Sequence, residues 1–131
     1  MKKSITLLVL IILCQSNYSY CQKTLLDGKT FSINMFDINN PSNTIKETLH
    51  FVKGKLDAEQ SRAHGFKPTI YTSFEIKKGM ISWDANCQSP KEGTMSWSGK
   101  SKGDKIAGEV IWEKKGKSVT TYRYRGQQVK K

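Results

Sequence analysis

The sequence has few of the residues on which catalysis and metal binding usually depend. His50 and His64 are the only two histidines in 131 residues. There are three cysteines, but two of them lie in the first 21 residues, so the remainder of the chain carries Cys87 alone. One thiol cannot form an internal disulfide, and the fold must therefore be held together by its core. The length fits a single domain.

Helical periodicity is almost absent after residue 22. Short runs of alternating apolar and polar residues follow one another instead, separated by turns that contain Gly and Lys. This pattern is typical of strands in a meander. Closure into a barrel removes the exposed edges of such a sheet. We therefore expect an all-β fold, a single antiparallel up-and-down barrel of seven to eight strands, with a helical turn only at residues 59–66.

The alternation also predicts which side chains face the interior of the barrel. The expected inward residues include Phe31, Ile33, Met35, Leu49, Phe51, Ile70, Phe74, Ile76, Ile81, Trp83, Ala85, Met95, Trp97, Ile106, Val110 and Trp112. Because Ile70, Phe74 and Ile76 are expected to face inward, Tyr71, Ser73 and Glu75 in the same strand are expected to face outward. Residues 37–43, which include Pro41, are expected to form a loop. Cys87 continues the face of Ala85 and is expected to be a small buried side chain.

Residues 1–21 differ from the rest and have the layout of a secretory signal peptide. Lys2 and Lys3 precede an apolar run over residues 5–13, which is too short to span a bilayer as a stable helix. Cleavage after Cys21 would leave Gln22 as the new N-terminus. We therefore predict a signal peptide over residues 1–21 and a barrel domain over residues 22–131.

The predicted leader implies export to the periplasm or the medium. A lipid anchor is disfavoured, because a bulky residue, Leu13 or Tyr20, precedes each cysteine of the leader. The alternative is that the leader stays attached as an N-terminal anchor.

A resemblance to known barrels rests on one stretch of the chain. Its residues are Ser89, Pro90, Gly93, Met95, Trp97, Gly99, Gly103, Asp104, Ile106, Gly108 and Trp112. The stretch resembles the calycin group of small lipocalin-like barrels, and within it a family of exported bacterial proteins of unknown function. Residues 51–56 and 65–66 also fit, so the resemblance covers most of the chain after the leader. It implies the fold and no particular activity; a faint similarity to avidins does not extend to their biotin-contacting residues.

Aromatic residues supply the candidate ligand-binding site. The residues are Trp83, Trp97, Trp112, Tyr122 and Tyr124. They could line a cavity for a small apolar molecule that enters at a rim near Trp97, Trp112 and Tyr124. Alternatively they fill a narrow barrel, because an eight-stranded interior is one that side chains can nearly fill.

Positive charge is the second feature that suggests a partner. The formal net charge is +11, of which Lys2 and Lys3 in the predicted leader contribute two. A candidate surface for anionic partners comprises Lys77, Lys78, Lys100, Lys102 and Lys105. In a meander these lysines share one rim, whereas Lys91 and the lysines at 114–117 lie at the other. Such a rim could attract nucleic acid, anionic glycan or lipid head groups, or it could serve solubility and edge protection alone.

The sequence supports catalysis or metal binding less well than it supports the two binding surfaces above. Asp57, Glu59 and His64 form a loose group without a fourth ligand, which is a weak basis for a metal site. Ser61 near His64 lacks the strand-turn-helix setting of a nucleophile. We therefore expect a non-enzymatic binding or structural module, monomeric and without metal or cofactor. The alternatives are an electrostatic binder of anionic polymers or surfaces, and an unrecognised enzyme.

Overall fold

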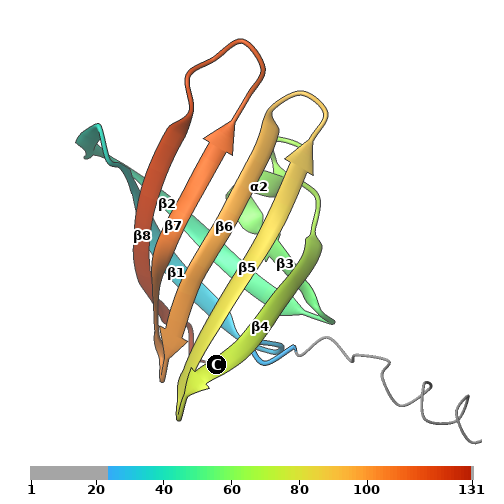
Figure 1. Cartoon of the computed structure of the whole chain (residues 1–131), viewed down its shortest axis with the longest axis vertical. Helices are drawn as coiled ribbons and strands as arrows, with labels where there is room; N and C mark the ends of the chain where they lie inside the picture. Colours follow the sequence, from blue (N-terminus) through green and yellow to red (C-terminus); the bar gives the residue numbers. More distant parts are fainter. Residues whose placement is uncertain (1–23, 131) are drawn as a thin grey trace, which may run out of the picture.

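A computed structural model describes residues 24–130, which form a closed barrel of eight antiparallel strands (Figure 1). The strands are β1 (Thr30–Asp37), β2 (Asn40–Val52), β3 (Lys55–Ala58), β4 (Thr69–Lys77), β5 (Met80–Ser89), β6 (Gly93–Lys102), β7 (Lys105–Glu113) and β8 (Thr120–Gln128). Each strand pairs with the next in the chain, and β8 closes the barrel by pairing with β1. The predicted all-β, up-and-down barrel is thus confirmed.

A short helix, α2 (Glu59–Arg62), lies between β3 and β4, where the sequence predicted a helical turn. Within residues 24–130 no helix is both long enough and apolar enough to cross a bilayer. The predicted signal peptide and its cleavage point at Cys21–Gln22 lie outside the described residues.

Aromatic side chains pack the middle of the barrel. The Phe51 ring meets Tyr71 edge to face at a centroid distance of 4.9 Å and Trp83 at 5.0 Å. Trp83 in turn stacks on Trp97 at 6.4 Å, and Trp97 contacts Tyr124 at 5.5 Å. Large rings in such offset and edge-on contacts bury much apolar area and dominate the energetics of a small core. The barrel is therefore filled by side chains through its centre.

Two glycines make room for the innermost tyrosine. Gly99 on β6 and Gly108 on β7 are direct cross-strand partners, and Gly108 is in turn the partner of Tyr124 on β8. A Cβ atom at either glycine would collide with the Tyr124 hydroxyl or with the neighbouring backbone. The space that they leave lets this hydroxyl donate a hydrogen bond of 2.9 Å to the carbonyl oxygen of Ser98.

The predicted orientation of β4 is wrong. Tyr71 and Ser73 are buried, whereas Ile70, Phe74 and Ile76 are exposed. The inward tyrosine is compatible with the core because its ring packs on Phe51 while its hydroxyl is hydrogen-bonded to residues 26 and 27. Alternation alone predicts that the more apolar face of β4 points inward, because it contains no information about these distant hydrogen-bond partners.

The predicted loop over residues 37–43 is also wrong. β1 and β2 are joined by a tight turn, and β2 begins at Asn40. The pairing register shifts between Phe36, which faces Thr44, and Asp37, which faces Asn40. Pro41 falls in the bulged segment between these pairs, where a strand needs no backbone N–H for its ladder.

The two ends of the barrel are built differently. One end carries the β2–β3, β4–β5 and β6–β7 turns and is covered by residues 24–29; we call it the plugged end. Leu26 in this segment is fully buried. Gly28, two residues later, donates a backbone hydrogen bond to the carbonyl oxygen of Phe51. The opposite end, which we call the helix end, carries α2 together with the β1–β2, β5–β6 and β7–β8 turns.

Candidate functional site

A pocket of about 230 Å³ opens at the helix end of the barrel. Its lining residues are Met35, Ile45, Glu47, Gln60, Ser61, His64, Phe66, Glu92, Met95, Trp112 and Tyr122. They come from β1, β2, β6, β7 and β8, from α2, from the segment between α2 and β4, and from the β5–β6 turn. The pocket is therefore the part of the barrel interior that the central aromatic residues leave unfilled.

A buried carboxylate forms part of the pocket floor. Glu47 lies on the inward face of β2, between Ile45 and Leu49, and only 4% of its surface is exposed. Its Oε1 accepts the backbone N–H groups of Thr48 at 2.8 Å and Gln60 at 2.7 Å. Its Oε2 accepts the backbone N–H of Ser61 at 3.0 Å and the Ser61 hydroxyl at 2.9 Å.

These four hydrogen bonds satisfy the carboxylate group of Glu47 in its buried position. A carboxylate offers about four lone-pair directions, and all of them are used. Two of the donors, the N–H groups of Gln60 and Ser61, belong to the first turn of α2, where backbone N–H groups have no partner within the helix. Glu47 therefore anchors α2 to the barrel wall and has little capacity left to bind a charged ligand.

A second chain of hydrogen bonds fixes the rim of the pocket. The Trp112 indole N–H donates to the backbone carbonyl of Glu92 at 2.6 Å. The Ser89 hydroxyl accepts the backbone N–H of Glu92 and donates to the carbonyl of His64. This chain joins the β5–β6 turn to the segment after α2 and holds the Trp112 ring in one orientation against the pocket.

An ion pair adds to the same rim. Lys114 Nζ lies 3.1 Å from the carboxylate of Glu92. The hydrogen bond and the charge of Lys114 hold the pKa of Glu92 below its usual value. At neutral pH this pair ties the β7–β8 connection to the β5–β6 turn.

The remaining lining is mainly apolar and adaptable. Met35 and Met95 contribute flexible thioether side chains, which adjust to ligands of irregular shape. Trp112 and Tyr122 are half-buried and present aromatic surface. Burial, together with the nearby charge of Asp37, raises the pKa of Tyr122, so its hydroxyl stays protonated at neutral pH. The arrangement suits a small, uncharged apolar molecule.

The five aromatic residues predicted to bind a ligand fall into two groups. Trp112 and Tyr122 line the pocket. Trp83, Trp97 and Tyr124 lie in the packed middle of the barrel and are almost completely buried. Burial raises the pKa of Tyr124, with the adjacent Trp83 indole acting in the opposite direction.

The sequence did not identify Glu47, Phe66 or Met35 as ligand-binding residues, although it predicted that Met35 faces the interior of the barrel. Glu47 carried a usable signal, because it occupies the position two residues before Leu49, on a face that is otherwise apolar. Phe66 lies outside the strands, where alternation makes no prediction.

The loose acidic group around α2 is divided among separate partners. Asp57 accepts a hydrogen bond from Arg62, and Glu59 lies 3.0 Å from Nε2 of His50. His64 instead lies at the pocket, where its backbone carbonyl accepts the Ser89 hydroxyl. Among residues 24–130 no three His, Cys, Asp or Glu side chains are grouped so that they could hold a metal ion.

Cys87 faces inward on β5 and is buried, as its place in the alternation predicted. Burial raises the pKa of its thiol to about 12, with the carboxylates of Asp57 and Glu47 acting in the same direction. The thiolate is the nucleophilic form of cysteine, so we expect this thiol to react slowly at neutral pH.

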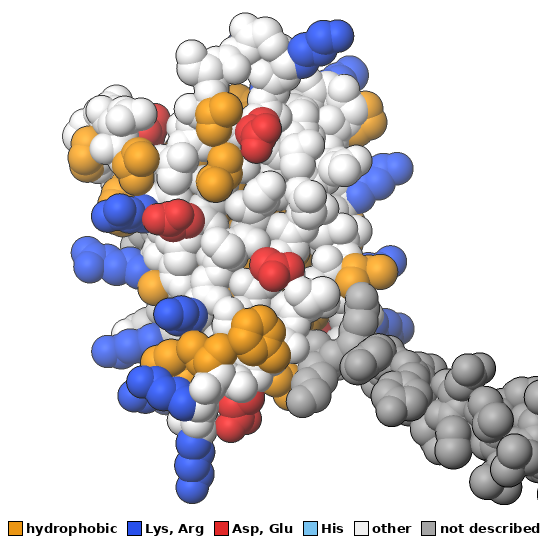
Figure 2. All heavy atoms as spheres, viewed as in Figure 1, with side chains coloured by type: hydrophobic (Ala, Val, Ile, Leu, Met, Phe, Trp, Pro, Cys, Tyr) orange, Lys and Arg blue, Asp and Glu red, His pale blue; other side chains and the backbone are white. Residues whose placement is uncertain are grey.

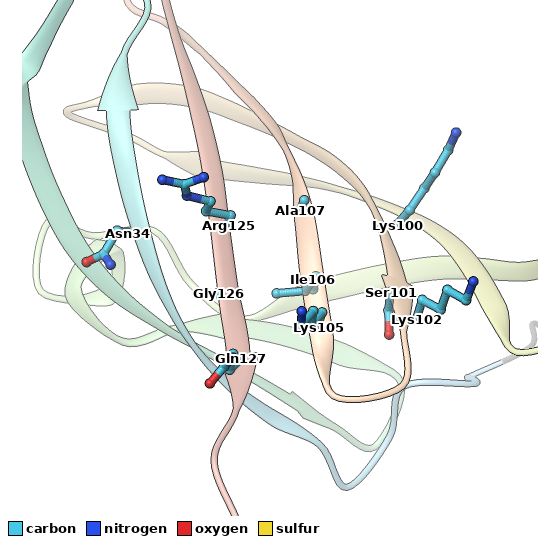
Figure 3. A pocket seen from close by; sticks show the side chains of 10 residues that line it. All are labelled: Asn34, Lys100, Ser101, Lys102, Lys105, Ile106, Ala107, Arg125, Gly126 and Gln127. Carbon is cyan, nitrogen blue, oxygen red and sulfur yellow. The ribbon is translucent and has the colours of Figure 1, made fainter.

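The lysines predicted to attract anionic partners gather at the plugged end. Met80 is the cross-strand partner of both Lys77 and Lys102, which brings the β4–β5 and β6–β7 turns together. A shallow hollow of about 470 Å³ lies beside them on the outer wall. Figure 3 shows Lys100 and Arg125 leaving the wall on either side of Ala107, with Lys102 and Lys105 nearer the turn.

Comparison of the chain with known protein families, curated proteins and solved structures found no match.

Proposed function

We propose that this protein is a small-molecule binding module that takes an uncharged apolar ligand at the helix end of its barrel. The observation that carries the proposal is the pocket of about 230 Å³ between the packed aromatic core and the end of the barrel. Such a space is preformed by the fold and lined by apolar surface, which is what binding of a small ligand requires.

The size and chemistry of the pocket narrow the class of ligand. Its volume lies below the range of about 300–1,000 Å³ that is typical for drug-sized ligands, which favours one or two rings or a short acyl chain. Glu47 is saturated with hydrogen bonds, and Glu92 is paired with Lys114. Neither acidic group is free to pair with a cationic ligand, and this favours a neutral one.

The proposal includes a lipocalin-like relationship, export and a monomeric, non-enzymatic role. The closed eight-stranded meander supports the first, since it is the architecture that the resemblance implies. The Ser61 hydroxyl donates to Glu47 rather than to a histidine, and the Cys87 thiol is buried. These contacts support a binding role over nucleophilic catalysis.

A ligand screen with a pocket-filling variant tests the proposal. The probes are neutral one- and two-ring aromatic compounds and straight-chain alcohols, and the measurements are tryptophan fluorescence and the melting temperature. A binder should change the emission of Trp112 and raise the melting temperature by mass action. Met95→Trp should fill the pocket and abolish both effects.

Met80→Trp, the same substitution at a half-buried site at the plugged end, is the matched control and should leave binding intact. The proposal fails if no probe raises the melting temperature, or if a binder is unaffected by Met95→Trp in a variant that remains folded.

A further inference from the structure

The outer face of β4 carries apolar side chains that the barrel does not cover. Ile70, Phe74 and Ile76 have exposed fractions of 55%, 53% and 42%. We call these three residues the β4 patch. Val52 extends it, since its partner Lys55 pairs in turn with Ile70. Large apolar side chains grouped on the outside of a small protein mark a surface that contacts something else.

Positive side chains surround the β4 patch on two sides. Lys77, directly after Ile76, is the last residue of β4, and Lys78 begins the β4–β5 turn. Across β5, Ser82 is the cross-strand partner of both Phe74 and Lys100, so that this lysine lies one strand away from the patch. Lys102, Lys105 and Arg125 continue the positive surface around the hollow on the outer wall. In Figure 2, Lys and Arg side chains lie to the left of and below the apolar side chains near the plugged end, with an acidic side chain beneath them.

Acidic groups offset part of this charge. Asp84 on β5 faces Thr72 of β4 and accepts a hydrogen bond of 2.7 Å from its hydroxyl, and Glu109 on β7 lines a shallow hollow together with Phe74 and Lys100. Glu75 lies within β4, and Asp104 lies in the β6–β7 turn. The carboxylate of Asp27 accepts hydrogen bonds from Gly54 and Tyr71 and is not available to the lysines. The basic residues on this part of the surface outnumber the acidic ones and leave it with a net positive charge; they are Lys55, Lys77, Lys78, Lys100, Lys102, Lys105 and Arg125, against Glu75, Asp84, Asp104 and Glu109.

We propose that the β4 patch and its lysines dock the barrel, plugged end first, on an anionic phospholipid bilayer. Aliphatic and aromatic side chains enter the boundary between head groups and acyl chains, while lysines contact the anionic head groups. Nucleic acid or anionic glycan could contact the lysines but offers no apolar environment in which Ile70 and Ile76 could be buried. A second copy of the chain would bring like charge against the same lysines.

This inference is independent of the pocket at the helix end. The docked surface and the pocket lie at opposite ends of the barrel, so that docking would leave the pocket accessible.

Co-sedimentation with lipid vesicles tests the docking. The vesicles are phosphatidylcholine alone and phosphatidylcholine mixed with about one-third phosphatidylglycerol, and every variant is made in the full chain. The leader is then identical throughout, so differences between variants report on the β4 patch. We expect tighter binding to the anionic vesicles, weakened by salt.

Two pairs of matched variants separate the apolar and charged contributions. The double variant Phe74→Ser with Ile76→Ser should weaken binding to anionic vesicles roughly tenfold or more. The control is Ile38→Ser with Val119→Ser, which replaces two exposed apolar residues at the helix end and should leave vesicle binding unchanged. Replacement of Lys77, Lys78 and Lys102 by Gln should weaken it by roughly fivefold for each lysine. The same replacement of Lys91, Lys115 and Lys117 at the helix end removes equal charge and should have a smaller effect.

Three results would overturn the proposal. The first is equal binding to neutral and anionic vesicles, or equal effects of the two members of either variant pair. The second is retention on DNA or heparin at moderate salt that Phe74→Ser with Ile76→Ser leaves unchanged, together with no vesicle binding. The third is a concentration-dependent dimer, seen by sedimentation, that this double variant abolishes while vesicle binding is absent.

Discussion

The Tyr71 hydroxyl donates a hydrogen bond of 2.8 Å to Oδ1 of Asp27 and accepts one of 3.1 Å from the backbone N–H of Leu26. The same Asp27 carboxylate accepts the backbone N–H of Gly54. These bonds hold residues 24–29 across the plugged end and connect them to β4 and to the β2–β3 turn. Burial, and then the bond to Asp27, raise the pKa of Tyr71, which keeps its hydroxyl protonated as a donor.

Tyr71→Phe should destabilise the barrel by about 1–3 kcal/mol, because the buried N–H of Leu26 loses its acceptor. Urea denaturation measures the change. Tyr122→Phe removes a hydroxyl from a half-buried tyrosine at the helix end and should cost less. Equal losses in the two variants would mean that the Tyr71 hydroxyl does not anchor residues 24–29 to β4.

Glu47→Gln should lower the free energy of unfolding by roughly 2–3 kcal/mol. The amide nitrogen of glutamine would replace an acceptor with a donor, and it would face N–H groups that now bond to the carboxylate. Glu59→Gln, at an exposed position on the same helix, is the control and should change stability little. A Glu47 variant as stable as the parent would contradict the anchoring of α2 by this carboxylate.

Gly99→Ala should destabilise the fold by about 1–3 kcal/mol or more, because overpacking forces the backbone or Tyr124 to move. The added Cβ would lie 2.6 Å from the carbonyl oxygen of Ala107 and against the Tyr124 hydroxyl. Thermal unfolding measures the effect, and Ser98→Ala on the exposed face of the same strand serves as the reference. A melting temperature unchanged by Gly99→Ala would show that the contact can relax at no cost.

Cys87 should resist thiol reagents in the native state and react once the chain is unfolded. Peptide mapping by mass spectrometry separates Cys87 from the cysteines at 14 and 21. Stability should also depend on alkaline pH through this residue, because its folded pKa of about 12 lies above the ordinary value of 9.0.

The unfolded thiol ionises first, so its contribution is fully present below the ordinary pKa and is lost as the pH rises toward the folded value. Cys87→Ala should therefore lose less stability than the parent between neutral pH and pH values above the ordinary thiol pKa. Rapid native labelling at neutral pH would refute the buried, protonated state.

Much of the architecture could be predicted from the order of residues alone. Alternation over β1, β5, β6 and β7 predicts strands, and it predicts the inward faces of Phe31, Trp83 and Trp97 correctly. Here the polar side chains lie on one face and the apolar ones on the other, so each strand has a single favourable orientation. Because successive hairpins of a meander alternate between the two ends of the barrel, the sequence also predicted that the lysines of the β4–β5 and β6–β7 turns share one end, which the strand order confirms.

For residues that can be accommodated either inside or outside the barrel, only the tertiary structure decides which way the side chain faces. β4 has apolar side chains on one face and Tyr71 and Ser73 on the other, and distant partners at residues 24–27 turn the second face inward. Glu47 is tolerated inside because residues 60 and 61 supply N–H groups from a helix that follows another strand. Local periodicity cannot predict such partners. The hydrogen bonds that offset the cost of burying a polar group form only when the barrel closes.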